Sequence, residues 1–136
     1  MINVSTDQDG IATIEWNMPG RAQNVLNEAS IDAFATAIRQ VMTDPAVKGV
    51  LVASGKSDFH AGADLGMVLG QSDAEQVHAV VQTWHKLLRQ MGPGGQPIGA
   101  AMSGATLWGG FALALACHCR VAADRRNTSF GFPEVK

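Results

Sequence analysis

The sequence has few cysteines, no long apolar run and no block of like charge, and each absence narrows the kind of protein. No apolar stretch reaches the roughly 18 residues that a membrane-spanning helix needs. The net charge is −2, from 10 basic and 12 acidic residues, and the longest basic run is Arg125-Arg126. This balance argues against nucleic acid or an anionic membrane as a partner.

The two cysteines, Cys117 and Cys119, lie two residues apart. So close a pair suits a disulfide poorly, and nothing with zinc-like spacing accompanies them. We therefore expect reduced thiols and no bound metal. Residues 1–7 lack the basic and apolar regions of a signal peptide, which predicts a cytoplasmic protein.

The chain alternates strand patterns with helix patterns, and with 46% hydrophobic residues it has the composition of one folded domain over 1–136. Alternating or β-branched apolar runs predict strands, and apolar positions every three to four residues predict helices. The alternation is typical of an α/β fold with crossover connections. The predicted strands are 2–5, 11–16, 47–53, 98–102 and 119–123, and the predicted helices run from Asn27 to Asp44, over 72–91 and over 109–116.

Three of these elements carry enough apolar side chains to be placed in the core. The run 47–53 is typical of a strand buried on both faces. The helix 109–116 is apolar almost all round and is therefore expected to be buried. The helix 72–91 begins with the capping box 72–75. Its expected buried side consists of Val77, Val80, Val81, Trp84, Leu87, Leu88 and Met91.

Several weaker patterns carry little function. The segment 54–57 resembles the end of a phosphate-binding loop, but the glycine at Gly49 is one residue out of place, so Lys56 is expected to be a solvated turn residue. The histidines His60, His78 and His85 form no recognisable ligand set, and surface or packing roles are favoured. No Gly-x-Ser-x-Gly elbow is present.

Two small-residue turns, 59–65 and 103–110, are the most informative segments. Each follows a strand pattern and precedes a helix pattern. Such turns leave backbone N–H groups uncovered, and two of them aimed at one point can hold an oxyanion. Taken singly, each is also explained as a tight turn that glycine makes possible.

Together with two further segments, these turns resemble the crotonase, or enoyl-CoA hydratase/isomerase, family. The matching pieces are 16–26, 59–65, 103–110 and 130–134, in that order along the whole chain. The Met-Pro-Gly-Arg variant at Met18 to Arg21 is most similar to the hydratase/isomerase region of multifunctional fatty-acid-oxidation α-subunits. The resemblance implies a crotonase-like α/β fold (the ClpP/crotonase fold) of repeated ββα units, of which this chain is the truncated N-terminal portion.

The same resemblance implies roles for individual residues. The backbone N–H groups of Ala63 and Gly109 would hold the thioester oxygen of an acyl-CoA, with Gly110 beside them. Near the CoA, Arg21 resembles a basic residue that meets the phosphates, although Gly20 is an extra residue in that pattern. Gly62 belongs to the first turn, and Ala61 and Asp64 resemble positions that meet the adenine end.

The resemblance also exposes a departure in the acid–base pair of the hydratases. One glutamate is present as Glu134, but the other position holds Ala112, which cannot accept a proton. The small residue that usually precedes the Gly-Gly pair is replaced by Trp108. Three explanations stay open for the alanine: an engineered substitution that traps substrate, divergence towards Δ3,Δ2-enoyl-CoA isomerisation by Glu134 alone, and a non-catalytic binding or assembly fragment.

The expected function is therefore acyl-CoA binding and enoyl-CoA hydration in fatty-acid β-oxidation, impaired at position 112. No cofactor is expected, because CoA arrives as part of the substrate. The expected partners are the acyl-CoA or enoyl-CoA thioester and either further copies of the chain, in a homo-oligomer (trimer or hexamer), or a multifunctional complex.

Overall fold

The fold is built on a five-stranded sheet in the order β1-β2-β3-β4-β6. The computed structural model describes residues 1–64, 66, 70, 74–93 and 95–132. The antiparallel pair β1–β2 is followed by parallel pairings only. A second, two-stranded parallel sheet is formed by β5 and β7. The strands are β1 (Ile2–Thr6), β2 (Ile11–Trp16), β3 (Gly49–Ser54), β4 (Ile98–Met102), β5 (Ala105–Leu107), β6 (Cys119–Ala122) and β7 (Ser129–Gly131).

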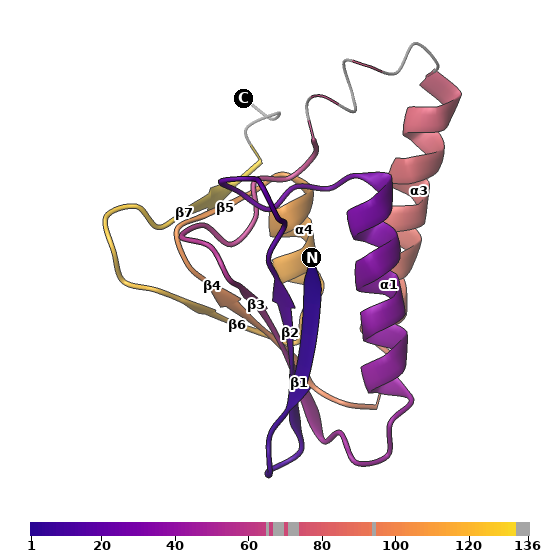
Figure 1. Ribbon diagram of the computed structural model, residues 1–136, viewed down its shortest axis with the longest axis vertical. Coiled ribbons are helices and arrows are strands. Elements are labelled where there is room, and N and C mark those ends of the chain that lie inside the picture. Colours follow the sequence, from indigo (N-terminus) through magenta and orange to yellow (C-terminus); the bar gives the residue numbers. More distant parts are fainter. Residues whose placement is uncertain (65, 67–69, 71–73, 94, 133–136) are drawn as a thin grey trace.

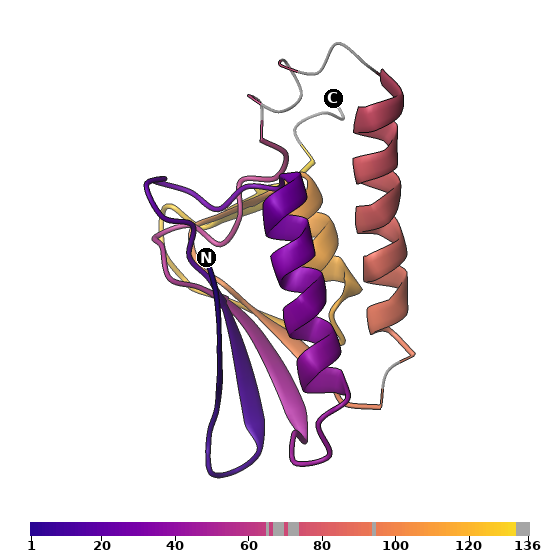
Figure 2. The same cartoon turned by 45° about the vertical axis from the view of Figure 1, so that its right-hand side comes forward.

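In the part of the chain that the structure describes, three helices lie on one side of the large sheet (Figures 1 and 2). They are α1 (Glu28–Met42), α3 (Ala74–Met91) and α4 (Gly109–Ala116). Helix α1 packs against β1 and β2, and α4 packs against β4 and β5. Helix α3 packs against both of these helices. The predicted α/β fold with crossover connections is confirmed, and the three helices cover one face of the sheet.

Helix α1 begins where the sequence places its cap. The Asn27 side chain accepts a hydrogen bond from the Ser30 amide at 2.8 Å, and the Ser30 hydroxyl accepts from the Asn27 amide at 3.0 Å. This reciprocal pairing satisfies two amide donors that the first helical turn would otherwise leave free. The cap therefore fixes the start of α1 directly after Leu26, the residue that pairs with Ala63 of the first turn.

The core between sheet and helices is centred on Trp16, at the end of β2. Its ring stacks on Phe34 at a centroid distance of 5.2 Å and meets Trp84 edge-on at 6.3 Å. Phe34 and Trp84 also contact each other, at 5.9 Å. One residue each from β2, α1 and α3 therefore forms a single aromatic cluster, which ties the two outer helices to the strand.

Burial differs from the sequence-based expectation in three elements. In α3, Trp84, Leu87, Leu88 and Met91 are buried, but Val81 is 43% exposed. In α4, only Gly110, Leu113 and Ala114 are buried, and Leu115 is 48% exposed. Leu51 and Ala53 on the far face of β3 are half-buried. These expectations were wrong because the described residues place no second layer against those surfaces.

Strand β6, which forms one edge of the large sheet, is exposed to solvent. All four of its residues are exposed, with Val121 at 70%.

Both cysteines are free thiols, Cys117 buried and Cys119 exposed, as the sequence predicts. Among the described residues, no helix combines the length and apolar composition needed to cross a membrane.

Candidate active site

The two small-residue turns pack directly against each other. Gly62 lies so close to Trp108 that a Cβ built on Gly62 would approach the Trp108 Cγ to 2.8 Å and the Leu107 carbonyl oxygen to 3.0 Å. The φ angle of Gly62 is +92°, a value that residues with a Cβ rarely adopt. Glycine is therefore required at position 62 by its backbone conformation and by this close approach.

Backbone pairing directs the Ala63 amide away from its neighbouring strand segment. The Leu26 amide donates to the Gly62 carbonyl at 2.7 Å, and the Asp64 amide donates to the Leu26 carbonyl at 2.9 Å. Because successive peptide groups of an extended chain point to opposite sides, the Ala63 N–H faces the other way. In the part of the chain that the structure describes, this amide donates no hydrogen bond.

The Gly109 amide is the first of α4 and is held by contacts around its residue. The Trp84 indole N–H donates to the Gly109 carbonyl at 3.3 Å, and a Cβ on Gly109 would collide with the Leu26 side chain. The first N–H groups of a helix have no partner within it, and the helix dipole places positive potential there. Within the described residues, the Gly109 N–H has no acceptor.

The residue before this helix adopts a backbone conformation that favours glycine. Trp108 has φ 56° and ψ −131° and is the only non-glycine residue with positive φ in the described chain. Its amide donates to the Gly131 carbonyl of β7 at 3.1 Å. Backbone strain like that at Trp108 collects at functional sites and is held by surrounding contacts.

The predicted second turn, 103–110, is not a turn throughout, because its residues 105–107 form β5.

The buried side chain of Asn24 holds the segment that carries Leu26 in place by hydrogen bonds to four other residues. Asn24 is 0% exposed, yet it belongs to a loop. Sequence reasoning assigned it no role, since a single polar residue before an apolar pair gives no signal of its long-range partners. Its amide nitrogen donates to the Trp16 carbonyl at 2.8 Å, the Ser54 Oγ at 2.9 Å and the Phe59 carbonyl at 3.2 Å, and its Oδ1 accepts from the Met18 amide at 3.2 Å.

Replacement of this side chain is expected to destabilise the fold strongly. Asn24→Ala leaves the Phe59 carbonyl and the Met18 amide without a partner, whereas the Trp16 carbonyl keeps the Gly55 amide at 3.0 Å. Each buried group left unpaired costs about 1–3 kcal/mol, so we expect a loss of about 2–6 kcal/mol, measured by urea denaturation. Asn3→Ala, which removes an exposed hydrogen bond to Glu15, is the control and should change stability by less than about 0.5 kcal/mol. Equal effects of the two substitutions would contradict this role.

His60, at the start of the first turn, is a buried packing histidine, as expected. It is 1% exposed, and burial lowers its pKa to about 3. Its ring meets Trp16 edge-on at 4.6 Å. His78 and His85 are exposed. The His60 ring is therefore neutral at physiological pH and belongs to the core beneath the turns.

The lowered pKa predicts how stability depends on pH. An unfolded chain binds a proton at His60 below about pH 6.5, whereas the native protein does not until pH approaches 3. Stability should therefore fall as pH decreases from 6.5 towards 3, by up to about 1.4 kcal/mol per pH unit from this residue. Denaturation midpoints of the parent protein and of His60→Asn over pH 4–7 measure the difference. Parallel pH profiles would contradict the prediction.

Two of the residues expected near the CoA, Arg21 and Asp64, form an ion pair. The Arg21 Nη2 lies 2.9 Å from the Asp64 Oδ2. Lys56 is not a free surface residue, because its ammonium donates to the Arg21 carbonyl at 2.7 Å. The Ala61 amide donates to the Asn24 carbonyl at 2.9 Å. A guanidinium carries five N–H donors, so this pair leaves Arg21 able to bind a phosphate as well.

Only one of the two predicted acid–base positions lies in the described chain. Ala112 is half-buried in the first turn of α4, and its amide donates to the Trp108 carbonyl at 3.0 Å. Position 112 therefore lies one helical turn from Gly109. Glu134 lies outside the described residues, and its role stays a prediction.

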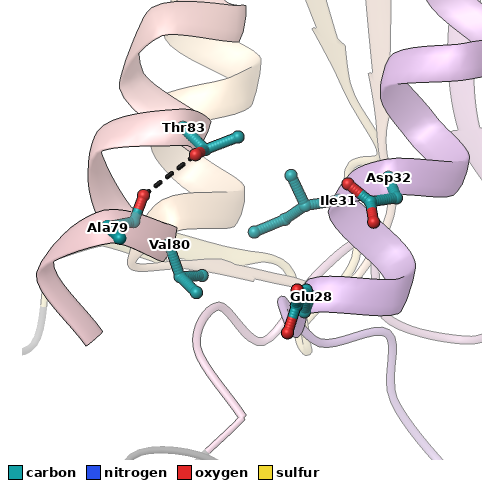
Figure 3. Close-up of a pocket in the computed structure, with 6 residues that line it drawn as sticks. All are labelled: Glu28, Ile31, Asp32, Ala79, Val80 and Thr83. Carbon is teal, nitrogen blue, oxygen red and sulfur yellow. Dashed lines mark hydrogen bonds between the residues drawn. The ribbon is translucent and has the colours of Figure 1, made fainter. Parts of the chain in front are cut away.

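A cavity of about 150 Å³ lies between α1 and α3 rather than at the turns (Figure 3). Two carboxylates of α1, Glu28 and Asp32, line it, and no described residue of either turn does. Acidic walls disfavour a ligand with phosphate groups. The remaining lining residues are Ile31, Ala79, Val80 and Thr83.

The mostly parallel sheet, the helices on one of its faces and the paired turns define a crotonase-like α/β protein. The family model described as enoyl-CoA hydratase/isomerase matches residues 6–136. The chain belongs to the enoyl-CoA hydratase/isomerase family.

Named relatives agree with this family. The chain is 37% identical over 135 residues to the fatty acid oxidation complex subunit alpha of Shewanella frigidimarina (strain NCIMB 400), covering 98% of this chain and 19% of that protein. The same subunit of Idiomarina loihiensis (strain ATCC BAA-735 / DSM 15497 / L2-TR) is 36% identical over 129 residues, which cover 94% of this chain and 18% of the relative. This chain therefore spans about a fifth of the length of these curated relatives.

Solved structures share the fold. The enoyl-CoA hydratase of Bacillus anthracis superposes with a TM-score of 0.89 at 29% identity, over 98% of this chain and 50% of that one. An enoyl-CoA hydratase/isomerase from Xanthobacter autotrophicus Py2 gives a TM-score of 0.86 at 27% identity, over 98% and 49%. The chain thus spans about half the length of these structures.

Proposed function

We propose that the chain binds acyl-CoA thioesters and serves enoyl-CoA hydration in fatty-acid β-oxidation. The observation that carries the proposal is the direct packing of the two turns, which leaves the amides of Ala63 and Gly109 without acceptors among the described residues. A thioester oxygen is the acceptor that such a pair suits, because negative charge develops on it when the neighbouring carbon becomes an enolate.

The chemistry follows from polarisation of that carbonyl. Two positioned donors and the positive end of α4 stabilise the enolate formed when water adds to the β-carbon. The adding water loses one proton to solvent, and hydration ends when a proton is delivered to the α-carbon, for which Glu134 is the proposed residue. Position 112 supplies no second carboxylate, and loss of one positioned acid or base typically lowers a rate by about 10²–10⁴.

The remaining contacts are assigned to the CoA part of the substrate. Arg21 is proposed to meet its phosphates, and Ala61 and Asp64 its adenine end, with the Arg21–Asp64 pair fixing both side chains. Gly110 keeps the second donor close to the first turn. No separate cofactor takes part, and the protein is proposed to act as a homo-oligomer or within a multifunctional complex.

A second candidate is Δ3,Δ2-enoyl-CoA isomerisation, which Ala112 favours. Isomerisation moves one proton between the α and γ carbons and adds no water, so a single carboxylate, proposed as Glu134, is sufficient. Both candidates need the same oxyanion site and differ only in the reaction that follows.

Exchange of the α-proton of butanoyl-CoA in D₂O tests the shared step. We expect the protein to accelerate exchange above the uncatalysed rate. Exchange at the uncatalysed rate would reject both reactions and favour a non-catalytic binding or assembly fragment. Crotonyl-CoA hydration and conversion of 3-hexenoyl-CoA to its 2-enoyl isomer, measured side by side, separate the two enzymes.

A further inference from the structure

The backbone of His60 joins the first turn to the strand that leads into the second. Its amide donates to the Ala105 carbonyl at 3.1 Å, and its carbonyl accepts from the Leu107 amide at 2.9 Å. His60 pairs in this way with Thr106 across an isolated parallel bridge. The position of His60 is therefore fixed by β5, two residues before Gly109.

The side chain of His60 contacts both turns at once. Its Nδ1 accepts a hydrogen bond from the Gly62 amide at 2.9 Å. On the other side the ring lies against Gly110, where a Cβ would approach both the ring Cγ and Nδ1 to 2.7 Å. One imidazole thus touches the residue before Ala63 and the residue after Gly109.

This arrangement requires the neutral ring in one tautomer. Nδ1 can accept from Gly62 only when it carries no proton, so the proton resides on Nε2. Burial, which lowers the pKa of the ring to about 3, favours the same form. The Nε2 atom is buried and has no hydrogen-bond partner within the described chain. Burying an unpaired N–H costs free energy, and an apolar side chain at position 60 would avoid this cost. Only an acceptor at the δ position, however, satisfies the Gly62 amide.

We propose that His60 is a positioning residue of the oxyanion hole: by accepting from Gly62 and packing on Gly110, it sets the spacing of the Ala63 and Gly109 amides. His60 touches no substrate atom and acts through these two turns. The inference rests on the proposed function, because the spacing matters only if both amides bind one thioester oxygen.

Two variants separate the acceptor from the bulk of the side chain. His60→Asn keeps an acceptor at the δ position, whereas His60→Leu keeps an apolar side chain without one. The readout is the ratio of affinities for butanoyl-CoA and S-butyl-CoA, a thioether with the same CoA and chain but no carbonyl oxygen. A purely structural role would weaken both ligands alike and leave this ratio unchanged.

For the parent protein we expect a clear preference for the thioester. His60→Leu should reduce the ratio about tenfold, equivalent to about 1.4 kcal/mol, and His60→Asn should retain most of it. Equal ratios in all three proteins, with a preference for the thioester, would overturn the role of His60 alone. No preference in the parent protein would overturn the proposed function itself.

A measurement on the unsubstituted protein keeps the proposal testable if a variant does not fold. Ring ¹⁵N chemical shifts of His60 at pH 7 report which nitrogen carries the proton. We expect an unprotonated, hydrogen-bonded Nδ1 and a protonated Nε2. A protonated Nδ1 could not accept from Gly62 and would overturn the proposal.

Discussion

The substitution Ala112→Glu is expected to raise crotonyl-CoA hydration by at least about tenfold, since one positioned acid or base typically contributes about 10²–10⁴ in rate. Position 112 lies in the first turn of α4, with its amide bonded to Trp108. A carboxylate there is close to Gly109 and near the positive end of the helix, where it costs little stability. Initial hydration rates of the purified parent and variant proteins, measured by loss of enoyl-thioester absorbance, test this prediction.

Ala116→Glu is the matched control for Ala112→Glu. Ala116 is also half-buried, but it is the last residue of α4, one turn further from the site. A glutamate at this end adds the same charge without approaching the oxyanion donors. We expect no gain from it. An unchanged hydration rate in Ala112→Glu, or an equal gain in Ala116→Glu, would contradict a lost catalytic glutamate at position 112.

Gly62→Ala is expected to weaken butanoyl-CoA binding by at least about tenfold, a loss of 1.4 kcal/mol in binding. The added Cβ meets Trp108 and the Leu107 carbonyl, in a backbone conformation with φ +92°. The turns must separate to accommodate it, which moves the Ala63 amide away from that of Gly109. Strain and overpacking together should also cost about 2–4 kcal/mol of folding stability.

Gly10→Ala separates displacement of the turns from loss of stability. Gly10 has φ +83°, and its added Cβ would lie 2.9 Å from the Ala46 carbonyl oxygen. It lies in the β1–β2 connection and lines neither turn. We expect a comparable loss of stability in urea denaturation but an unchanged affinity for butanoyl-CoA, measured by calorimetry below the unfolding transition. Equal loss of affinity in both variants would show that position 62 acts through stability alone.

The order and type of most elements could be predicted because their signals are local. The alternation in β2, the β-branched run of β3 and the cap at Asn27 are each read within a few residues. Strand β5 escaped prediction because it has three residues and is defined by pairing with β7, more than 20 positions later. The exposure of α4 could not be predicted either, since the burial of a helix depends on neighbouring elements rather than on its composition.

The residues of the candidate site could likewise be predicted only where their signal is local. Ala63 and Gly109 were predicted from turn sequences within a family resemblance, and the structure brings their two turns into contact. The roles of Asn24 and His60 depend on partners up to 50 positions away, the separation of His60 and Gly110, which no local pattern encodes. Glu134, beyond the described residues, remains a prediction.

Amide chemical shifts of Ala63 and Gly109 measure the central claim most directly. The protein is titrated with butanoyl-CoA and, separately, with S-butyl-CoA, and both amide resonances are followed by NMR. If the two N–H groups hold the thioester oxygen, both proton signals move downfield with butanoyl-CoA and stay nearly in place with S-butyl-CoA. Identical shifts with the two ligands, or no shift of either amide at saturation with butanoyl-CoA, would contradict the account.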